Sequence, residues 1–191
     1  MTNQAAFFLQ TYYSGTVAEK LAQTRDLYAH QAARLNASPL FRKELELLRH
    51  HALALSGQMQ SMDMGRLCSH CATRSDGGCC SAFMADNTDS LLLLINLLMG
   101  IKVQRRNKVD ENCCFLGEQG CIFLAKPIFC LNYNCKNIID SVDTESLEPL
   151  YRLAGAVLSQ QTRVETWLLD VLRGYDRNGE PEISPERPNI S

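Results

Sequence analysis

Nine cysteines, all between Cys68 and Cys135, are the residues of this 191-residue chain best suited to chemistry. Thiolates are the preferred ligands of structural zinc and of iron–sulfur clusters. The first residues lack the basic start and long apolar stretch of a secretory signal, so we expect a cytoplasmic protein with reduced thiols. The odd number also leaves at least one thiol over in any internal pairing. The cluster therefore predicts metal binding or redox chemistry rather than a disulfide framework.

The cysteines fall into two groups separated by an apolar segment. The first group starts with Cys68-x-x-Cys71, a spacing that lets two sulfurs face one point. The apolar segment between the groups can act as an arm that brings them together. The first group is Cys68, Cys71, Cys79 and Cys80, and the second is Cys113, Cys114, Cys121, Cys130 and Cys135.

This pattern resembles the cysteine-cluster family of zinc- or iron-chelating domains, over residues 68–135. The family signature runs Cys-x-x-Cys-x-x-Cys-Cys, Cys-x-Phe-Leu, Gly-Cys-x-Ile-Tyr and Arg-Pro-x-x-Cys. The gap between Cys71 and Cys79 is longer here, the gap from Cys121 to Cys130 is one residue shorter, and Lys126 and Leu131 stand where arginines are usual. The missing arginines weaken any anion-binding role, because lysine lacks the bidentate fork. The metal ligands that the resemblance implies are Cys68, Cys71, Cys79, Cys80, Cys113, Cys121, Cys130 and Cys135.

These cysteines exceed the four that one zinc ion or one cluster needs, so either two sites exist or one site has spare thiols. We expect Cys114 to be the thiol without a metal. Apolar residues crowd the second group, and they suit either the dry shell of an iron–sulfur cluster or the ordinary packing of the domain. General ligand preferences favour an iron–sulfur cluster slightly over zinc. His70 lies inside the Cys-x-x-Cys segment, where a side chain usually points away from the metal. We do not expect it to be a ligand.

Composition and charge exclude several other classes. Hydrophobic residues make up 46% and charged residues 21%, which is ordinary globular usage. The net charge of −2 does not indicate the positively charged surface that binding to nucleic acid requires. The longest apolar run, residues 91–101, is well below the roughly 20 residues of a membrane span. The basic residues that follow this apolar run are favourable near the C-terminus of a helix.

The elements that must position the cysteines are mainly helical, and we expect a helical bundle around a buried central helix. That central helix, at about 88–104 with Asn87 or Thr88 as its cap, is apolar on nearly every face. Ser38 can cap the helix expected at 39–56, and Gly57 ends or weakens that helix. Gly174 can end the helix expected at 146–174. The expected outer helices are 16–35, 39–56 and 146–174.

The cysteines are expected on two irregular metal-binding loops, at 68–82 and 107–140. Strand content should be small and confined to this cysteine region. The domain is expected to span 1–174, with 175–191 as a disordered tail rich in proline.

These observations predict a cytoplasmic metal-binding protein that holds an iron–sulfur cluster or zinc, in a redox, metal-handling or structural role. Two alternatives remain open. One is a metal-dependent enzyme with a redox or protein-modifying activity, although no phosphate-binding or hydrolase motif is present and no catalytic residue can be named. The other is a zinc-stapled module that binds a protein partner through its helical surface.

Overall fold

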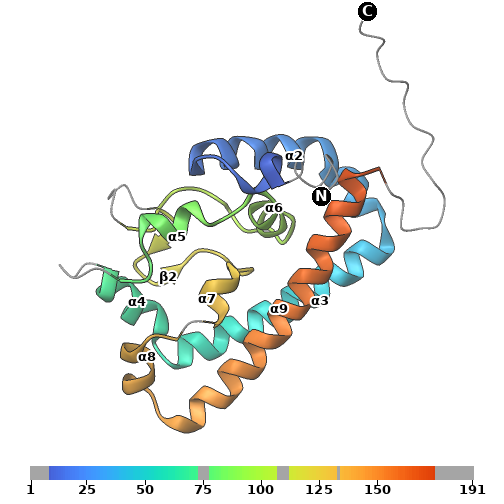
Figure 1. Ribbon diagram of the computed structural model, residues 1–191. Coiled ribbons are helices and arrows are strands. Elements are labelled where there is room, and N and C mark those ends of the chain that lie inside the picture. Colours follow the sequence, from blue (N-terminus) through green and yellow to red (C-terminus); the bar gives the residue numbers. More distant parts are fainter. Residues whose placement is uncertain (1–8, 73–77, 107–111, 133, 175–191) are drawn as a thin grey trace, which may run out of the picture.

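The computed structural model describes residues 9–72, 78–106, 112–132 and 134–174. The chain is mostly helical, as predicted (Figure 1). The elements in order are η1 Leu9–Tyr13, α2 Val17–Ala37, α3 Pro39–Ser61, α4 Met64–Ala72, α5 Ala82–Asp86, α6 Ser90–Leu98, β1 Leu116–Gly117, β2 Gly120–Cys121, α7 Ile128–Asn132, α8 Lys136–Ser141 and α9 Thr144–Leu172. The tail at 175–191 lies outside the described residues.

Side-chain caps start the long helices, and the sequence predicted the one at Ser38. Thr16 forms a capping box with Glu19 at the start of α2, and the Ser38 hydroxyl accepts a hydrogen bond from the Phe41 N–H, with Pro39 at the first position of α3. Asp143 caps α9 in the same way. The predicted helices at 16–35, 39–56 and 146–174 are confirmed, with shifts of a few residues at their ends.

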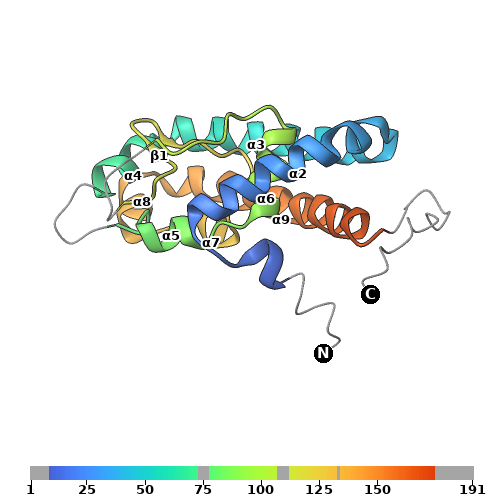
Figure 2. The same cartoon turned by 90° about the horizontal axis from the view of Figure 1, so that it is seen from above.

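The two longest helices, α3 and α9, pack side by side along the molecule (Figure 2). The aromatic rings of Phe41 and Trp167 meet in this interface with centroids 5.9 Å apart. Gly57 does not end α3, which continues to Ser61. A single exposed glycine costs a helix only about 1 kcal/mol, and the packing against α9 offsets that cost.

The helix α6 is buried, as the sequence predicts for its apolar run. Leu91, Leu93 and Leu94 are fully buried, and α6 packs against α2 and α9. Asp89 caps it, not Thr88 or Asn87, by accepting a hydrogen bond from the Leu92 N–H. It also stops earlier than the predicted residue 104, because Gly100 adopts a left-handed conformation with φ of 84°.

The strands of the described residues form one short antiparallel hairpin, β1–β2, which lies in the cysteine region as predicted. A small second core forms where the hairpin region meets α6, with Leu93, Phe115 and Phe123 at its centre. Across the four described ranges, no helix has both the length and the apolar composition to cross a membrane.

Candidate metal centre

The first cysteine pair lies on a helix, not on the predicted loop. Cys68 and Cys71 belong to α4. Residues three apart occupy one helix face, so the helix still aims both sulfurs the same way. Likewise Cys121 lies on β2 and Cys130 on α7, so short regular elements carry much of the cluster. The cysteine pattern alone did not distinguish such elements from irregular loops.

Two glycines allow α4 to approach the hairpin closely. A Cβ added to Gly65 would lie 2.2 Å from the Gln119 carbonyl oxygen, and one added to Gly120 would lie 2.8 Å from the Gly65 Cα. The Ser69 hydroxyl then donates to the Gly117 carbonyl at 2.7 Å. This backbone contact sets the distance between Cys68 on α4 and the second cysteine group. No single-sequence pattern pairs these two glycines.

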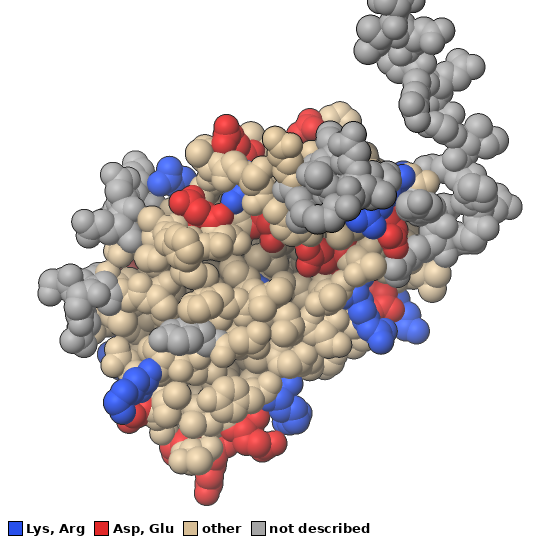
Figure 3. Space-filling model, viewed as in Figure 1, with Lys and Arg blue, Asp and Glu red and all other residues tan. Residues whose placement is uncertain are grey.

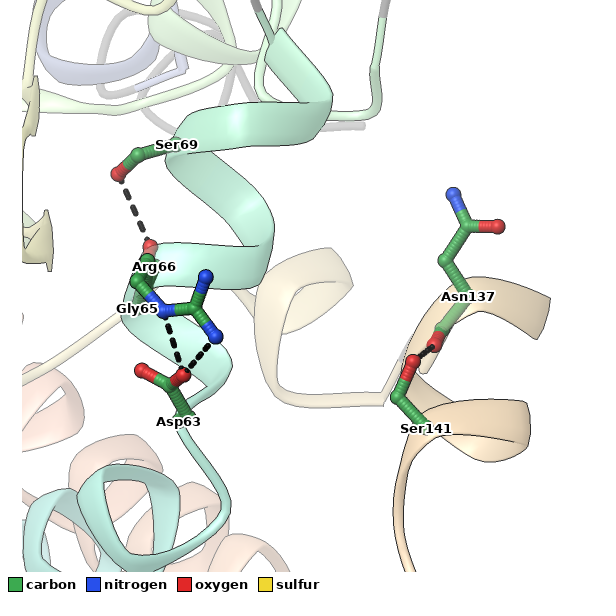
Figure 4. Close-up of polar contacts among 6 residues, drawn as sticks. All are labelled: Asp63, Gly65, Arg66, Ser69, Asn137 and Ser141. Carbon is green, nitrogen blue, oxygen red and sulfur yellow. Dashed lines mark hydrogen bonds and ion pairs between the residues drawn. The ribbon is translucent and has the colours of Figure 1, made fainter.

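The turn before α4 fixes the direction of that helix. Asp63 adopts a left-handed conformation with φ of 53°, which aspartate tolerates better than most residues. Its carboxylate accepts a hydrogen bond from Arg66 Nε at 2.6 Å (Figure 4). On the other side, the Asn137 amide of α8 lies 3.7 Å from the Cys71 sulfur. The α4 cysteines are therefore held between the hairpin and α8.

Direct backbone pairing joins the two cysteine groups. The Cys113 N–H donates to the Cys80 carbonyl at 2.9 Å, and Ser81 forms a bridge with Asn112. A second anchor is the buried Asn96 of α6. Its side-chain oxygen accepts from the N–H groups of 124 and 125 at 3.0 and 3.2 Å, and its nitrogen donates to the 125 carbonyl at 2.9 Å. That clamp holds the segment leading to Cys130.

The eight predicted ligand cysteines line two adjacent cavities that share Cys68 and Cys80. The wider cavity, about 190 Å³, is also lined by Cys113, Cys121 and Cys130. The narrower one, about 10 Å³, is also lined by Cys71, Cys79 and Cys135. None of the nine cysteines forms a disulfide.

Cys114 lines neither cavity. It is buried in the second core beside Phe115, and burial raises the pKa of its thiol while the nearby Arg105 opposes that shift. Cys114 lies in the turn that precedes β1, and there its side chain packs into the second core rather than toward the cavities. That Cys114 carries no metal stays a prediction.

Hydrogen bonds between thiols dominate the electrostatics where the cavities meet. A hydrogen bond with Cys80 lowers the pKa of Cys68, and one with Cys80 lowers the pKa of Cys79 to about 6. The same two bonds raise the pKa of Cys80, which keeps its proton between the two other sulfurs. In the wider cavity, burial raises the pKa of Cys113 to about 11 and that of Cys130 to about 12.

A buried lysine stands at the edge of the wider cavity, and the sequence did not predict its role there. Lys126 is 8% exposed, lines this cavity, and its ammonium donates to the Phe123 carbonyl. Its charge acts to lower the pKa of both Cys68 and Cys130. A cation in this place favours thiolates, the form that binds metal.

His70 is not at this centre, because it is exposed on α4 and lines neither cysteine cavity. Within the described part of the chain, no three His, Cys, Asp or Glu side chains are arranged so that they could already hold a metal ion.

Comparison with protein-family models, with curated proteins and with solved structures finds no match for this chain. The resemblance to the cysteine-cluster family therefore depends on the residues quoted above, and it stays a prediction.

Proposed function

We propose that this chain is a metal-binding protein whose clustered cysteines hold an iron–sulfur cluster or zinc, in a redox, metal-handling or structural role. One observation carries the proposal. The eight cysteines that the sequence nominates as ligands line two cavities in contact with each other, whereas the ninth, Cys114, lines neither. Cysteines that serve only to pack the core would not be expected to gather around two adjoining cavities.

The donor chemistry of the wider cavity fits an iron–sulfur cluster. Five thiols from α4, the segment before α5, the hairpin region and α7 surround about 190 Å³, which is more room than a single ion with bonds of about 2.3 Å to sulfur requires. Leu116 and Phe123 supply an apolar lining, which limits access of water. The Lys126 ammonium offsets part of the negative charge that bound thiolates would bring.

The narrower cavity keeps zinc as the alternative. Its volume of about 10 Å³ is close to that of one water-sized sphere, and five cysteines line it. The thiols are not yet in a coordinating arrangement, so metal loading must draw them together. Binding would then be coupled to local ordering, as in many small metal-binding domains.

A metal-dependent enzyme is the second candidate, because a large cavity adjoins the cysteines at Cys79. In that case the bound group would act on a small molecule next to it.

Anaerobic purification of the full chain, with iron, zinc and acid-labile sulfide measured against protein, tests the proposal. A brown protein with iron and sulfide in comparable amounts supports the cluster, and a colourless protein with stoichiometric zinc supports the alternative. A protein that carries no metal and takes up none when offered iron with sulfide, or zinc, contradicts both.

A further inference from the structure

A third cavity, larger than the two that the cysteines line, is lined by residues of α5, α7 and α9. Figure 1 shows where these three helices lie. The volume of this cavity, about 540 Å³, falls in the range of small-molecule sites, about 300–1,000 Å³. The face seen in Figure 3 is mostly free of charged side chains over α5 and α7, and the charges gather around its rim. The apolar residues that line the cavity are Phe83, Met84, Leu92, Pro127, Ile128 and Phe129.

Three of these apolar side chains remain exposed at the surface. Phe83 is 72% exposed, Ile128 58% and Phe129 46%. Large apolar side chains gathered around one hollow commonly mark a binding site. They provide a surface for the apolar part of a ligand.

The cavity also has a polar side, which consists of hydrogen-bond acceptors. The carboxylates of Asp89 and Glu165 both line it, and the Tyr13 hydroxyl donates to Glu165. Burial is the main cause that raises the pKa of Asp89 to about 6, and the charge of Glu165 adds to it. The two carboxylates therefore lie close enough to repel each other. The Arg173 charge also acts on Tyr13, but Arg173 does not line the cavity.

Gln161 provides an independent sign of a missing donor. It lines the same cavity and is only 5% exposed. Its side-chain nitrogen donates to the Lys126 carbonyl at 3.1 Å. This hydrogen bond identifies which end of the Gln161 amide is the nitrogen and therefore which end is the oxygen. That oxygen has no hydrogen-bond partner among the described residues. A buried acceptor left in this state costs about 1–3 kcal/mol, so a ligand that donates to it would be stabilised.

We propose that this cavity binds a small organic ammonium compound, with its apolar part against α5 and α7 and its ammonium group against Asp89, Glu165 and the Gln161 oxygen. A cation satisfies all three acceptors and relieves the repulsion between the carboxylates. An anion would be repelled, and a neutral apolar molecule would leave the Gln161 oxygen unpaired and the two carboxylates without a cation. The cavity adjoins the cysteine centre at Cys79, and the contacts proposed for the ammonium group involve none of the cysteines.

The test is calorimetric titration of the full chain, as purified, with n-hexylammonium, 1-hexanol and hexanoate at neutral pH. These probes share one alkyl chain and differ in the charge of the head group. We expect n-hexylammonium to bind at least about tenfold more tightly than either of the others. Equal binding of the ammonium and the alcohol, or no binding of the ammonium, overturns the proposal.

Matched variants locate the site. Glu165→Gln should weaken n-hexylammonium about tenfold, whereas Glu148→Gln, an exposed position on the same helix outside the cavity, should leave it unchanged. Asp89→Asn retains a helix cap and gives a second variant in case Glu165→Gln does not fold, which a thermal melt reports. Equal effects of the Glu165 and Glu148 changes refute the assignment, and where Glu165→Gln does not fold, full affinity in Asp89→Asn refutes it.

Discussion

Substitution of Gly65 by alanine should separate α4 from the hairpin and loosen the cysteine centre. The new Cβ would lie 2.2 Å from the Gln119 carbonyl oxygen and 2.8 Å from its carbon, and both are backbone atoms. Non-bonded contacts are favourable only from about 3.5 Å, so the hairpin must retreat by roughly 1 Å. Overpacking of this kind costs about 1–3 kcal/mol.

The matched control is Gly57→Ala in α3, where an added Cβ meets nothing within 4 Å. Both changes gain the helix propensity of alanine, about 0.5–1 kcal/mol, so the difference between the variants isolates the clash. We expect the midpoint of thermal unfolding, followed by circular dichroism, to be about 2–12 °C lower for Gly65→Ala than for Gly57→Ala. Metal bound per chain should also fall in Gly65→Ala alone. Equal midpoints and equal metal contents would refute the close contact.

Three further predictions concern buried polar side chains. Asn96→Leu should lower the free energy of unfolding, measured by urea titration, by at least about 3 kcal/mol. The change leaves the N–H groups of Leu124 and Ala125 and the Ala125 carbonyl without their hydrogen-bond partner. A loss below about 1 kcal/mol would contradict the role of Asn96 as a clamp. The pKa of Asp89 is raised from 3.8 to about 6, so its contribution to stability is present below pH 4 and lost as the pH rises through 6, by about 3 kcal/mol. Asp89→Asn, which keeps the cap, should therefore flatten the profile of unfolding free energy between pH 4 and 6, and an unchanged profile would count against the burial of this carboxylate. Lys126→Met should weaken metal binding about tenfold in a competition titration with a chelator, and unchanged affinity would show that its charge does not act on the thiols.

Local signals in the sequence predicted the long helices well. Ser38-Pro39 starts α3 and Gly174, with φ of 77°, follows the end of α9, because capping and left-handed conformations depend on a few neighbouring residues. The run at 91–95 could be recognised as buried because no face of that helix is polar. Errors arose where neighbouring signals compete. Thr88 and Asp89 are both capping residue types, and in the structure α6 begins at Ser90 with the Asp89 carboxylate as its cap.

The cysteine centre shows what one sequence cannot supply. The spacing of Cys68 and Cys71 suits a loop and a helix turn equally well, and only the packing of α4 on the hairpin distinguishes them. The burial of Lys126 depends on the clamp by Asn96, a contact between residues far apart in the chain. Such long-range contacts have no local signature. The nomination of ligand cysteines could nevertheless be made from the sequence, because thiols in this density have few other uses.

The central claim is tested most directly by the metal content per chain of three proteins purified anaerobically side by side: the unaltered chain, Cys80→Ser and Cys114→Ser. Cys80 lines both cysteine cavities, and Cys114 lines neither. We predict that Cys80→Ser loses most of its metal and that Cys114→Ser keeps the content of the unaltered chain. An unaltered chain without metal, or equal losses in the two variants, would contradict the account.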